Sequence, residues 1–327
     1  MQKILVIHNP YSGKQKHIQK TIKEMKKIAF NNGYDIEFIK TTKKHDATKI
    51  IQNVNEQYDI VLSMGGDGTF NEVVTGNVKR DNPFLLGHIP VGTTNDLKSS
   101  FGLSGNVLQS FESILKGKEV SYDVLSLNNT PFTYTAGFGK LLNIPYDTKK
   151  KDKMKFGYFA YINNGIFDIL TKKIKLYHVK YEIGGVINEI TTPLILVSNS
   201  NHMAGMKFYD DAKLNDDKFE VLIANTNSII KLAIGLLQIK TKKNSKYYKL
   251  IKTDNIKFTI KDSQDLKNWC IDGEKFEDKP NIYDIKVLKK IKCKVAKEAD
   301  YYIWYLLYYN IMGKYLLKKL NINVLKL

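Results

Sequence analysis

The sequence is poor in cysteine, because only Cys270 and Cys293 occur among its 327 residues. Two cysteines exclude a disulfide framework and a cysteine-based structural zinc site. Long hydrophobic runs are also missing, since no stretch reaches the roughly 18 to 20 apolar residues of a membrane-spanning helix. The first apolar run, residues 4–7, is too short for a secretory signal, so we expect the chain to stay in a reducing cytoplasm.

Acidic residues are scarce as well. The sequence has 51 Lys and Arg against 33 Asp and Glu, and this net charge of +18 calls for an anionic partner. No zinc-finger, RNA-recognition or leucine-zipper pattern is present, so we expect a phosphate-bearing molecule or an acidic membrane surface and no nucleic acid. Two lysine-rich stretches, residues 149–155 and 240–252, are either solvated faces or docking surfaces.

Apolar residues make up 43% of the sequence, and its length is sufficient for about two domains with real cores. In residues 1–120, short apolar strands alternate with segments of helical periodicity. The predicted strands are residues 4–7, 35–39, 60–62 and 85–89. Between them we expect helices, one followed by Gly33 and one capped by Asp46. This alternation predicts an α/β fold, a three-layer parallel-sheet domain that binds ligands at the carboxyl ends of its strands.

After residue 120 the pattern changes to short strands separated by turn residues, with helical interruptions at 156–171 and 229–239. The predicted strands are residues 120–127, 174–183, 186–190, 194–197, 219–223, 256–260 and 282–288. This pattern predicts a mostly antiparallel β-sandwich as the second domain, residues 121–295. We expect residues 296–327 to pack back on the first domain or on a membrane.

The strongest local signal is Gly-Gly-Asp-Gly-Thr at residues 65–69, between a predicted strand and a helix that contains Asn71 and Glu72. Glycines at such a turn let backbone N–H groups approach a phosphate, and the helix N-terminus adds favourable partial charge. Asp67 would repel a bare phosphate, so we expect it to act with a magnesium ion that bridges the phosphates. Tight turns need glycine anyway, so this motif alone is weak evidence.

Three more polar turns follow predicted strands: residues 9–14, Thr41 with Thr42, and residues 90–96. Because the carboxyl ends of parallel strands lie at one edge of a sheet, we expect these turns to meet the glycine turn in one site. Packing alone does not explain four such turns, although Thr41 by itself is explained equally well as a packing residue.

Together these motifs resemble the diacylglycerol kinase catalytic domain, with the closest likeness to soluble bacterial diacylglycerol kinases and related lipid kinases. The matching motifs are Asn-Pro-x-Ser-Gly-Lys (9–14), Gly-Gly-Asp-Gly-Thr-x-Asn-Glu-Val (65–73) and Gly-Thr-x-Asn-Asp (92–96). Further matches lie at residues 122–124, 198–205, 211–216 and 271–274, so the resemblance covers about residues 1–295.

The resemblance implies that ATP binds between the two domains. Lys14 would reach its phosphates, and Asp67, with Asp96 and Asp123, would position catalytic Mg²⁺. Asp123 could otherwise be an ordinary turn residue. The implied nucleotide contacts are Asn9, Pro10, Tyr11, Ser12, Gly13, Lys14, Thr41, Gly65, Gly66, Asp67, Gly68, Thr69, Phe70, Asn71, Thr93, Asn95 and Asp96.

Transfer of a phosphoryl group to an alcohol needs a carboxylate that accepts the hydroxyl proton. The family resemblance places this base in Asp272-Gly273-Glu274. We favour Glu274 as the base with Asp272 beside it, although the spacing does not choose between them. Asp-Gly is also a preferred sequence of a type I′ hairpin turn, which is the alternative interpretation.

Residues 213–218 resemble a structural magnesium site of these kinases. The likeness gives Asp216 as the carboxylate ligand and the backbone carbonyls of Lys213 and Lys218 as further ligands. Family members usually have glycine where this chain has Asp217. They also tend to have an arginine shortly after the Asp96 motif, for which Lys98 is an imperfect substitute.

The tail begins with nine residues, 301–309, that are mostly tyrosine, tryptophan and leucine, and the lysines that follow are accompanied by no acid. Such residues favour a membrane–water interface, so an interfacial helix is one expectation. A helix packed on the first domain, or on a second subunit in a homodimer, is the other.

We therefore expect an ATP-dependent lipid kinase that converts diacylglycerol to phosphatidic acid, with its lipid presented at the inner face of the cell membrane. A sphingoid base, a polyprenol or NAD stays open as another acceptor. A non-catalytic protein that binds lipid or nucleotide at a membrane is the alternative from a different class. Asp67, Asp272 and Glu274 argue against it, because they are charged groups that only chemistry needs.

Overall fold

The structure is a computed structural model of the chain. It describes residues 1–13, 18–55, 57–92, 95–139, 175–199, 202–203, 206–207, 213–228, 231–232, 235, 245–261, 269–278, 280–297 and 299. The predictions for Lys14, Thr93, the helix at 156–171, the lysine-rich stretch 149–155 and the tail 301–327 lie outside these residues. The helix at 229–239 and the stretch 240–252 lie partly outside them.

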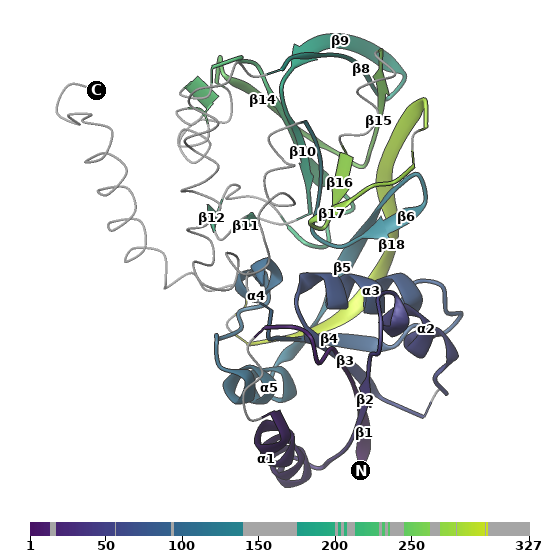
Figure 1. Cartoon of the computed structure of the whole chain (residues 1–327), viewed down its shortest axis with the longest axis vertical. Coiled ribbons are helices and arrows are strands. Elements are labelled where there is room, and N and C mark those ends of the chain that lie inside the picture. The colour runs from purple at the N-terminus through teal and green to yellow at the C-terminus, as the bar shows by residue number, and fades with distance from the viewer. Residues whose placement is uncertain are drawn as a thin grey trace, which may run out of the picture.

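Four parallel strands begin the larger sheet. In order across it they are β2 (Tyr34–Lys40), β1 (Gln2–His8), β3 (Ile60–Gly65) and β4 (Leu85–Pro90). Helices α1 (Ile18–Asn31) and α5 (Val107–Leu115) contact each other on one side, and α2 (Asp46–Asn53) and α3 (Asp67–Asn77) contact each other on the other (Figure 1). Residues 4–7 are fully buried because helices cover both faces of the sheet. The predicted three-layer α/β arrangement is confirmed.

The same sheet continues into the second half of the chain through one long strand, β18 (Ile282–Val295). It pairs in parallel with β4, and antiparallel with β5 (Lys118–Leu127) and β15 (Asn255–Ile260). The other strands of this part are β8 (Tyr177–Ile183), β9 (Val186–Thr192) and β6 (Thr130–Phe132). In Figure 1, β18 runs from beside the parallel strands up into the second half. This strand therefore belongs to both halves of the molecule.

A second, antiparallel sheet completes the sandwich. Its strands, in order, are β14 (Tyr248–Thr253), β13 (Phe219–Ala224), β10 (Ile195–Ser198), β7 (Thr135–Phe138), β16 (Trp269–Ile271) and β17 (Glu274–Lys275). β11 (His202–Met203) and β12 (Met206–Lys207) form a separate two-stranded ladder. Trp269 of this sheet stacks on Tyr283 of β18, with 5.1 Å between the ring centroids. The two sheets thus share one core, as the prediction of an antiparallel sandwich requires.

Helix boundaries differ from the prediction at a few positions. The prediction that Asp46 caps α2 is wrong, because the helix begins at Asp46 and its N-cap residue is His45. The Asp46 carboxylate instead accepts hydrogen bonds from the N–H and the hydroxyl of Thr42. The five-residue helix α4 (Asp96–Ser100) was not predicted. No helix within the described parts of the chain is long and apolar enough to cross a membrane.

Candidate active site

The polar turns that follow β1, β3 and β4 lie together, as the sequence predicted. The side-chain amide of Asn9 donates to the hydroxyl of Thr69 at 3.2 Å, and the N–H of Val91 donates to the carbonyl of Gly65 at 2.8 Å. These bonds join three separate segments at the carboxyl edge of the parallel strands. The turns therefore meet at one edge, which is where the sequence predicted a phosphate site.

Two of the glycines are required by close approaches between these turns. Gly13 has φ +63°, and a Cβ atom there would lie 1.8 Å from the carbonyl oxygen of Val91. A Cβ atom on Gly92 would lie 2.6 Å from the Cα of Gly66. Larger residues at these positions would separate the turns and widen the site.

Asp67 occupies the centre of this edge. Its carboxylate accepts hydrogen bonds from the backbone N–H groups of Asp96 at 2.9 Å and Leu97 at 3.3 Å, so it fixes the start of α4. Burial, together with the negative charges of Asp96 and Asp272, raises the pKa of Asp67 to about 7, although the two backbone hydrogen bonds act in the opposite direction. Acids that disfavour one another's charge in this way are suited to share a divalent cation.

Asp272 and Gly273 form the turn of the β16–β17 hairpin, and both have positive φ, 47° and 80°. The hairpin interpretation of the Asp-Gly sequence is therefore correct, and it does not exclude a role in the site. Burial raises the pKa of Asp272, although hydrogen bonds act in the opposite direction. The bonds are donated by the N–H and hydroxyl of Thr133 and the N–H groups of Tyr134 and Thr135, at 2.8 to 3.0 Å. The carboxylate of Asp272 is thus occupied as a structural anchor.

Glu274 has a different environment, although it lies only two residues further on. Its side chain is 56% exposed, and its carboxylate lies 2.6 Å from the ammonium group of Lys44, which is 60% exposed. Lys44 belongs to the turn between β2 and α2 in the parallel-sheet half. Of the two acids that the sequence could not separate, Glu274 is the one whose carboxylate is accessible.

A cluster of aromatic rings packs in the interior behind the glycine turn. Phe70, Phe101 and Tyr122 pack edge to face, with 5.5 to 6.5 Å between ring centroids. The hydroxyl of the fully buried Tyr122 donates to the carbonyl of Thr133, in the segment that binds Asp272. The glycine turn and the hairpin are therefore connected through packed and hydrogen-bonded side chains.

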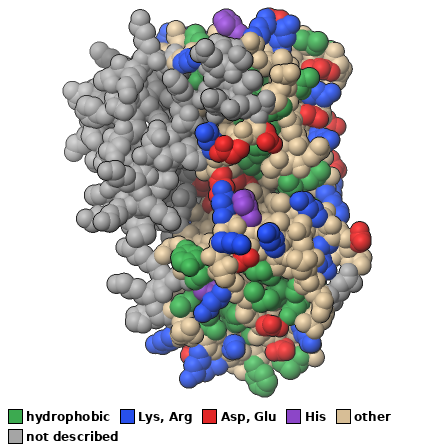
Figure 2. All heavy atoms as spheres, turned by 45° about the vertical axis from the view of Figure 1, so that its right-hand side comes forward, with side chains coloured by type: hydrophobic (Ala, Val, Ile, Leu, Met, Phe, Trp, Pro, Cys, Tyr) green, Lys and Arg blue, Asp and Glu red, His purple; other side chains and the backbone are tan. Residues whose placement is uncertain are grey.

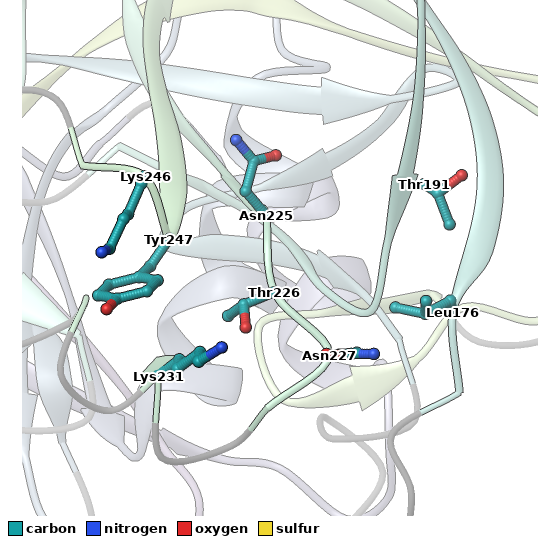
Figure 3. A pocket seen from close by; sticks show the side chains of 8 residues that line it. All are labelled: Leu176, Thr191, Asn225, Thr226, Asn227, Lys231, Lys246 and Tyr247. Atoms are coloured by element: carbon teal, nitrogen blue, oxygen red, sulfur yellow. The ribbon is translucent and has the colours of Figure 1, made fainter.

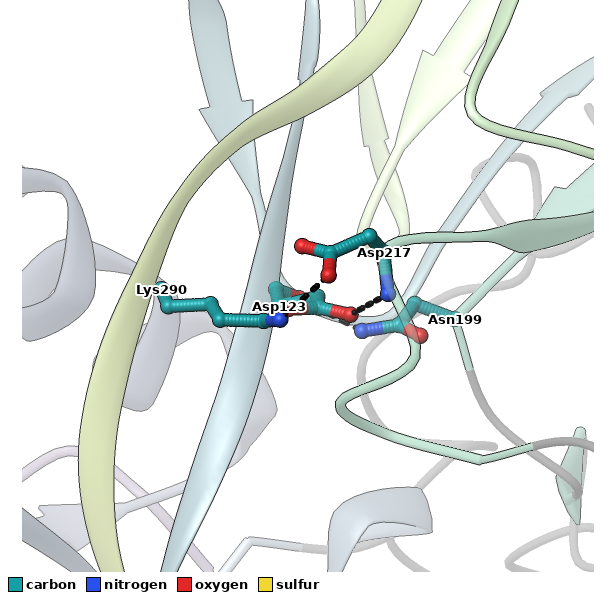
Figure 4. Close-up of polar contacts among 4 residues, drawn as sticks. All are labelled: Asp123, Asn199, Asp217 and Lys290. Carbon is teal, nitrogen blue, oxygen red and sulfur yellow. Dashed lines mark hydrogen bonds and ion pairs between the residues drawn. The ribbon is translucent and has the colours of Figure 1, made fainter.

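The charged neighbours of Asp123 differ from those of Asp67. Its fully buried carboxylate accepts a hydrogen bond from the N–H of Asp217 at 2.7 Å and lies 3.9 Å from the ammonium group of Lys290 (Figure 4). Burial raises the pKa of Asp123. The structure thus brings together Asp67, Asp96 and Asp272, and places Asp123 with the predicted structural metal site.

That second site contains unsatisfied oxygen atoms. The described residues include no group of three or more His, Cys, Asp or Glu side chains arranged to hold a metal ion. However, one carboxylate oxygen each of Asp123, Asp216 and Glu220 is buried without a hydrogen-bond partner. The other oxygen of Asp216 pairs with Lys252 at 2.7 Å. Unpaired oxygens fit a cation held by one carboxylate and backbone carbonyls, as the resemblance implies for Asp216, Lys213 and Lys218.

The described surface also contains a cavity of about 500 Å³ that the sequence did not predict. It lies at the ends of β8, β9, β13 and β14 (Figure 3), and none of the candidate nucleotide, catalytic or metal residues lines it. Its lining is mostly polar, so it does not fit acyl chains. Figure 2 shows acidic and basic side chains side by side near the middle of the face that it draws.

Sequence reasoning missed Lys44 and the full role of Glu72. Lys44 is one lysine among many in this sequence, and no pattern marks it. Glu72 belongs to the glycine motif, but its partners, the backbone N–H groups of His45 and Ala47, lie more than 20 residues earlier. Only the packing of α2 against α3 brings them together.

A phosphotransferase with an alcohol acceptor needs a phosphate-binding turn on one surface and a proton-accepting acid on another, and this chain belongs to that class of enzyme. Residues 3–127 match the model of the diacylglycerol kinase catalytic domain. Proteins named diacylglycerol kinase from two strains of Staphylococcus aureus are 30% identical to this chain over 271 residues, 82% of this chain and 85% of theirs. The chain belongs to the diacylglycerol kinase family.

Two solved structures from Bacillus anthracis str. Sterne, both assigned as diacylglycerol kinases, have the same fold. Their TM-scores are 0.73 and 0.69, with 22% and 19% sequence identity, and the match covers 90% of this chain and 97% of theirs. The two-domain arrangement described above is therefore also found in solved structures.

Proposed function

We propose that this lipid kinase uses ATP and Mg²⁺ to phosphorylate the hydroxyl group of diacylglycerol, giving phosphatidic acid. The observation that supports this best is the position of Glu274, an accessible acid of the sandwich that contacts Lys44 of the parallel-sheet half. The adjacent Asp272 is close enough to raise the pKa of Asp67. A proton acceptor and a phosphate-binding edge are thus near one another.

The geometry supports a division of labour among the residues of this chain. The N–H groups of the glycine turns and the segment Asn9–Gly13 would bind the phosphates of ATP. Bound Mg²⁺ would neutralise phosphate charge, and Asp67 and Asp96 would hold it. Glu274 accepts the proton of the lipid hydroxyl. The hydroxyl oxygen then bonds to the γ-phosphorus as the bond from that phosphorus to the departing ADP oxygen breaks.

The net charge of +18 supports presentation of the lipid at an anionic membrane surface. Lysines near such a surface each contribute about 1 kcal/mol of attraction, so a moderate excess is sufficient for reversible binding.

Incubation with labelled ATP and Mg²⁺ tests the proposal. The acceptors are diacylglycerol, a sphingoid base and a polyprenol in mixed micelles, and free NAD in solution. Labelled phosphatidic acid that is lost in Asp67→Ala and Glu274→Gln supports the proposal. Transfer of label to another acceptor alone would reassign the substrate, and transfer to none would overturn the proposal.

A further inference from the structure

The turn that contains Lys44 is exposed, but hydrogen bonds hold its backbone in one conformation. Thr42 is bound through its N–H at 2.7 Å and its hydroxyl at 3.0 Å to one oxygen of Asp46. His45 is held in the left-handed backbone region at φ +63°, which residues other than glycine rarely adopt. Backbone in a disfavoured conformation persists only where its surroundings enforce it, and such positions cluster at functional sites.

Glu72 enforces this conformation from the helix behind the glycine turn. One of its carboxylate oxygens accepts from the N–H of His45 at 2.9 Å and the other from the N–H of Ala47 at 3.3 Å. Its backbone carbonyl accepts from the hydroxyl of Thr48 at 2.8 Å. The position of Lys44 is therefore determined by the same helix, α3, that begins at Asp67.

The exposed side chain of Glu274 needs a partner that fixes its position. It lies on a two-residue strand at the edge of its sheet, and its side chain is more than half exposed. The ammonium group of Lys44, 2.6 Å away, is its partner across the two halves of the molecule. An ion pair between two exposed side chains adds little to folding stability. The hydrogen bonds that fix the Lys44 turn therefore indicate that this ion pair positions Glu274.

We infer that Lys44 is a positioning residue that holds the Glu274 carboxylate toward the phosphate-binding edge. This inference rests on the proposed function, in which Glu274 accepts the proton of the lipid hydroxyl. Without the ammonium group, Glu274 rotates freely in solvent and is aligned for proton transfer only part of the time. A misplacement of about 1 Å costs up to roughly 100-fold in rate.

Steady-state kinetics with ATP and diacylglycerol micelles test the inference. In Lys44→Met we expect kcat to fall roughly 10- to 100-fold while KM for ATP stays within about twofold. Lys44→Arg should recover most of kcat, because a guanidinium group also binds a carboxylate. The matched control is Lys43→Met, which removes the same charge from the adjacent exposed position of this turn and should leave kcat unchanged. In a Glu274→Gln background, Lys44→Met should cause no further loss.

Amide hydrogen exchange tests the contact without any activity. Exchange at residues 269–275 should rise severalfold in Lys44→Met and stay at the wild-type level in Lys43→Met. Equal kcat in the two methionine variants, or equal exchange in them, would overturn the inference. If the wild type phosphorylates no acceptor, the proposed function fails, and the exchange measurement still decides whether Lys44 holds the hairpin.

Discussion

Asp272 accepts two hydrogen bonds from Thr133, one from its backbone N–H at 2.8 Å and one from its hydroxyl at 3.0 Å. The two residues lie 139 positions apart in the sequence, so this contact closes the hairpin onto the segment between β6 and β7. The carboxylate of Asp272 therefore shapes the site, which leaves Glu274 as the residue that we propose accepts the proton.

Asp272→Ala should lower the free energy of unfolding by about 3 kcal/mol, because donors of Thr133, Tyr134 and Thr135 lose their acceptor. Glu274→Gln should change it by less than about 0.5 kcal/mol, since the side chain is exposed, and should reduce kcat at least roughly 100-fold. Urea denaturation and the lipid kinase assay measure the two effects. The assignment is wrong if Asp272→Ala is as stable as the wild type and Glu274→Gln remains active.

The buried imidazole of His88 should make the folded protein less stable in acid. Burial lowers the pKa of its imidazole to about 3, against 6.5 in the unfolded chain, although a hydrogen bond to the backbone of Ser63 acts in the opposite direction. Between these values the unfolded state binds one more proton, so the free energy of unfolding falls as pH falls, by up to about 1.4 kcal/mol per pH unit. His88→Gln should reduce this dependence in urea titrations at pH 7 and pH 4.5. His178→Gln, at an exposed position, should not.

Arg80 is the only arginine of the sequence, and its guanidinium donates to the carbonyls of Ile51, Gln52 and Val54 at 2.9 to 3.2 Å. It also stacks on Phe84, 4.3 Å from the ring centroid. An ammonium group does not reproduce this planar fork, so Arg80→Lys should lower the free energy of unfolding by about 1–3 kcal/mol. Thermal and urea denaturation measure it. A change below about 0.5 kcal/mol would show that the end of α2 does not depend on Arg80.

Asp217 has φ +59°, where family members usually have glycine, and its carboxylate pairs with Lys290 at 2.5 Å. Asp217→Gly and Asp217→Ala both remove this pair, but only glycine adopts the backbone conformation without strain. We expect Asp217→Ala to be less stable than Asp217→Gly by about 1–2 kcal/mol. Equal stability in urea denaturation would show that this turn relaxes to an ordinary conformation.

Magnesium should stabilise the folded chain through Asp216, whose second oxygen is buried without a partner. A ligand that binds only the folded state adds about 2.7 kcal/mol at 100 times its Kd. We expect Mg²⁺ to raise the Tm of the wild type, EDTA to reverse this, and Asp216→Asn to show a smaller rise. An equal rise in Asp216→Asn would place the binding elsewhere.

The parallel half and the glycine turn could be predicted from the sequence because their signals are local. Residues 4–7 and 60–62 are continuous apolar runs followed by turn residues. Such a pattern predicts a buried strand without information from distant parts of the sequence. In the sandwich, β6, β7, β14, β16 and β17 were not predicted, whereas the other strands were recognised individually. Their boundaries were less accurate, since β18 extends to Val295 and the prediction ended it at residue 288.

The different environments of Asp272 and Glu274 could not be predicted. It depends on donors at residues 133–135 and on Lys44, which come from distant parts of the sequence and carry no motif. The neighbours of Asp123 are hidden for the same reason. Its partner Lys290 is set by the register of β5 against β18, where the two residues face each other.

The long strand β18 also governs the order in which the molecule can be assembled. It pairs with β4, β5 and β15, yet it follows all three in the sequence and is therefore synthesised after them. Until then β4 has an unpaired edge, and unpaired edges favour association with other chains. Completion of the large sheet, and with it the joining of the two halves, therefore waits for the synthesis of β18 and depends on long-range pairing, which is slow.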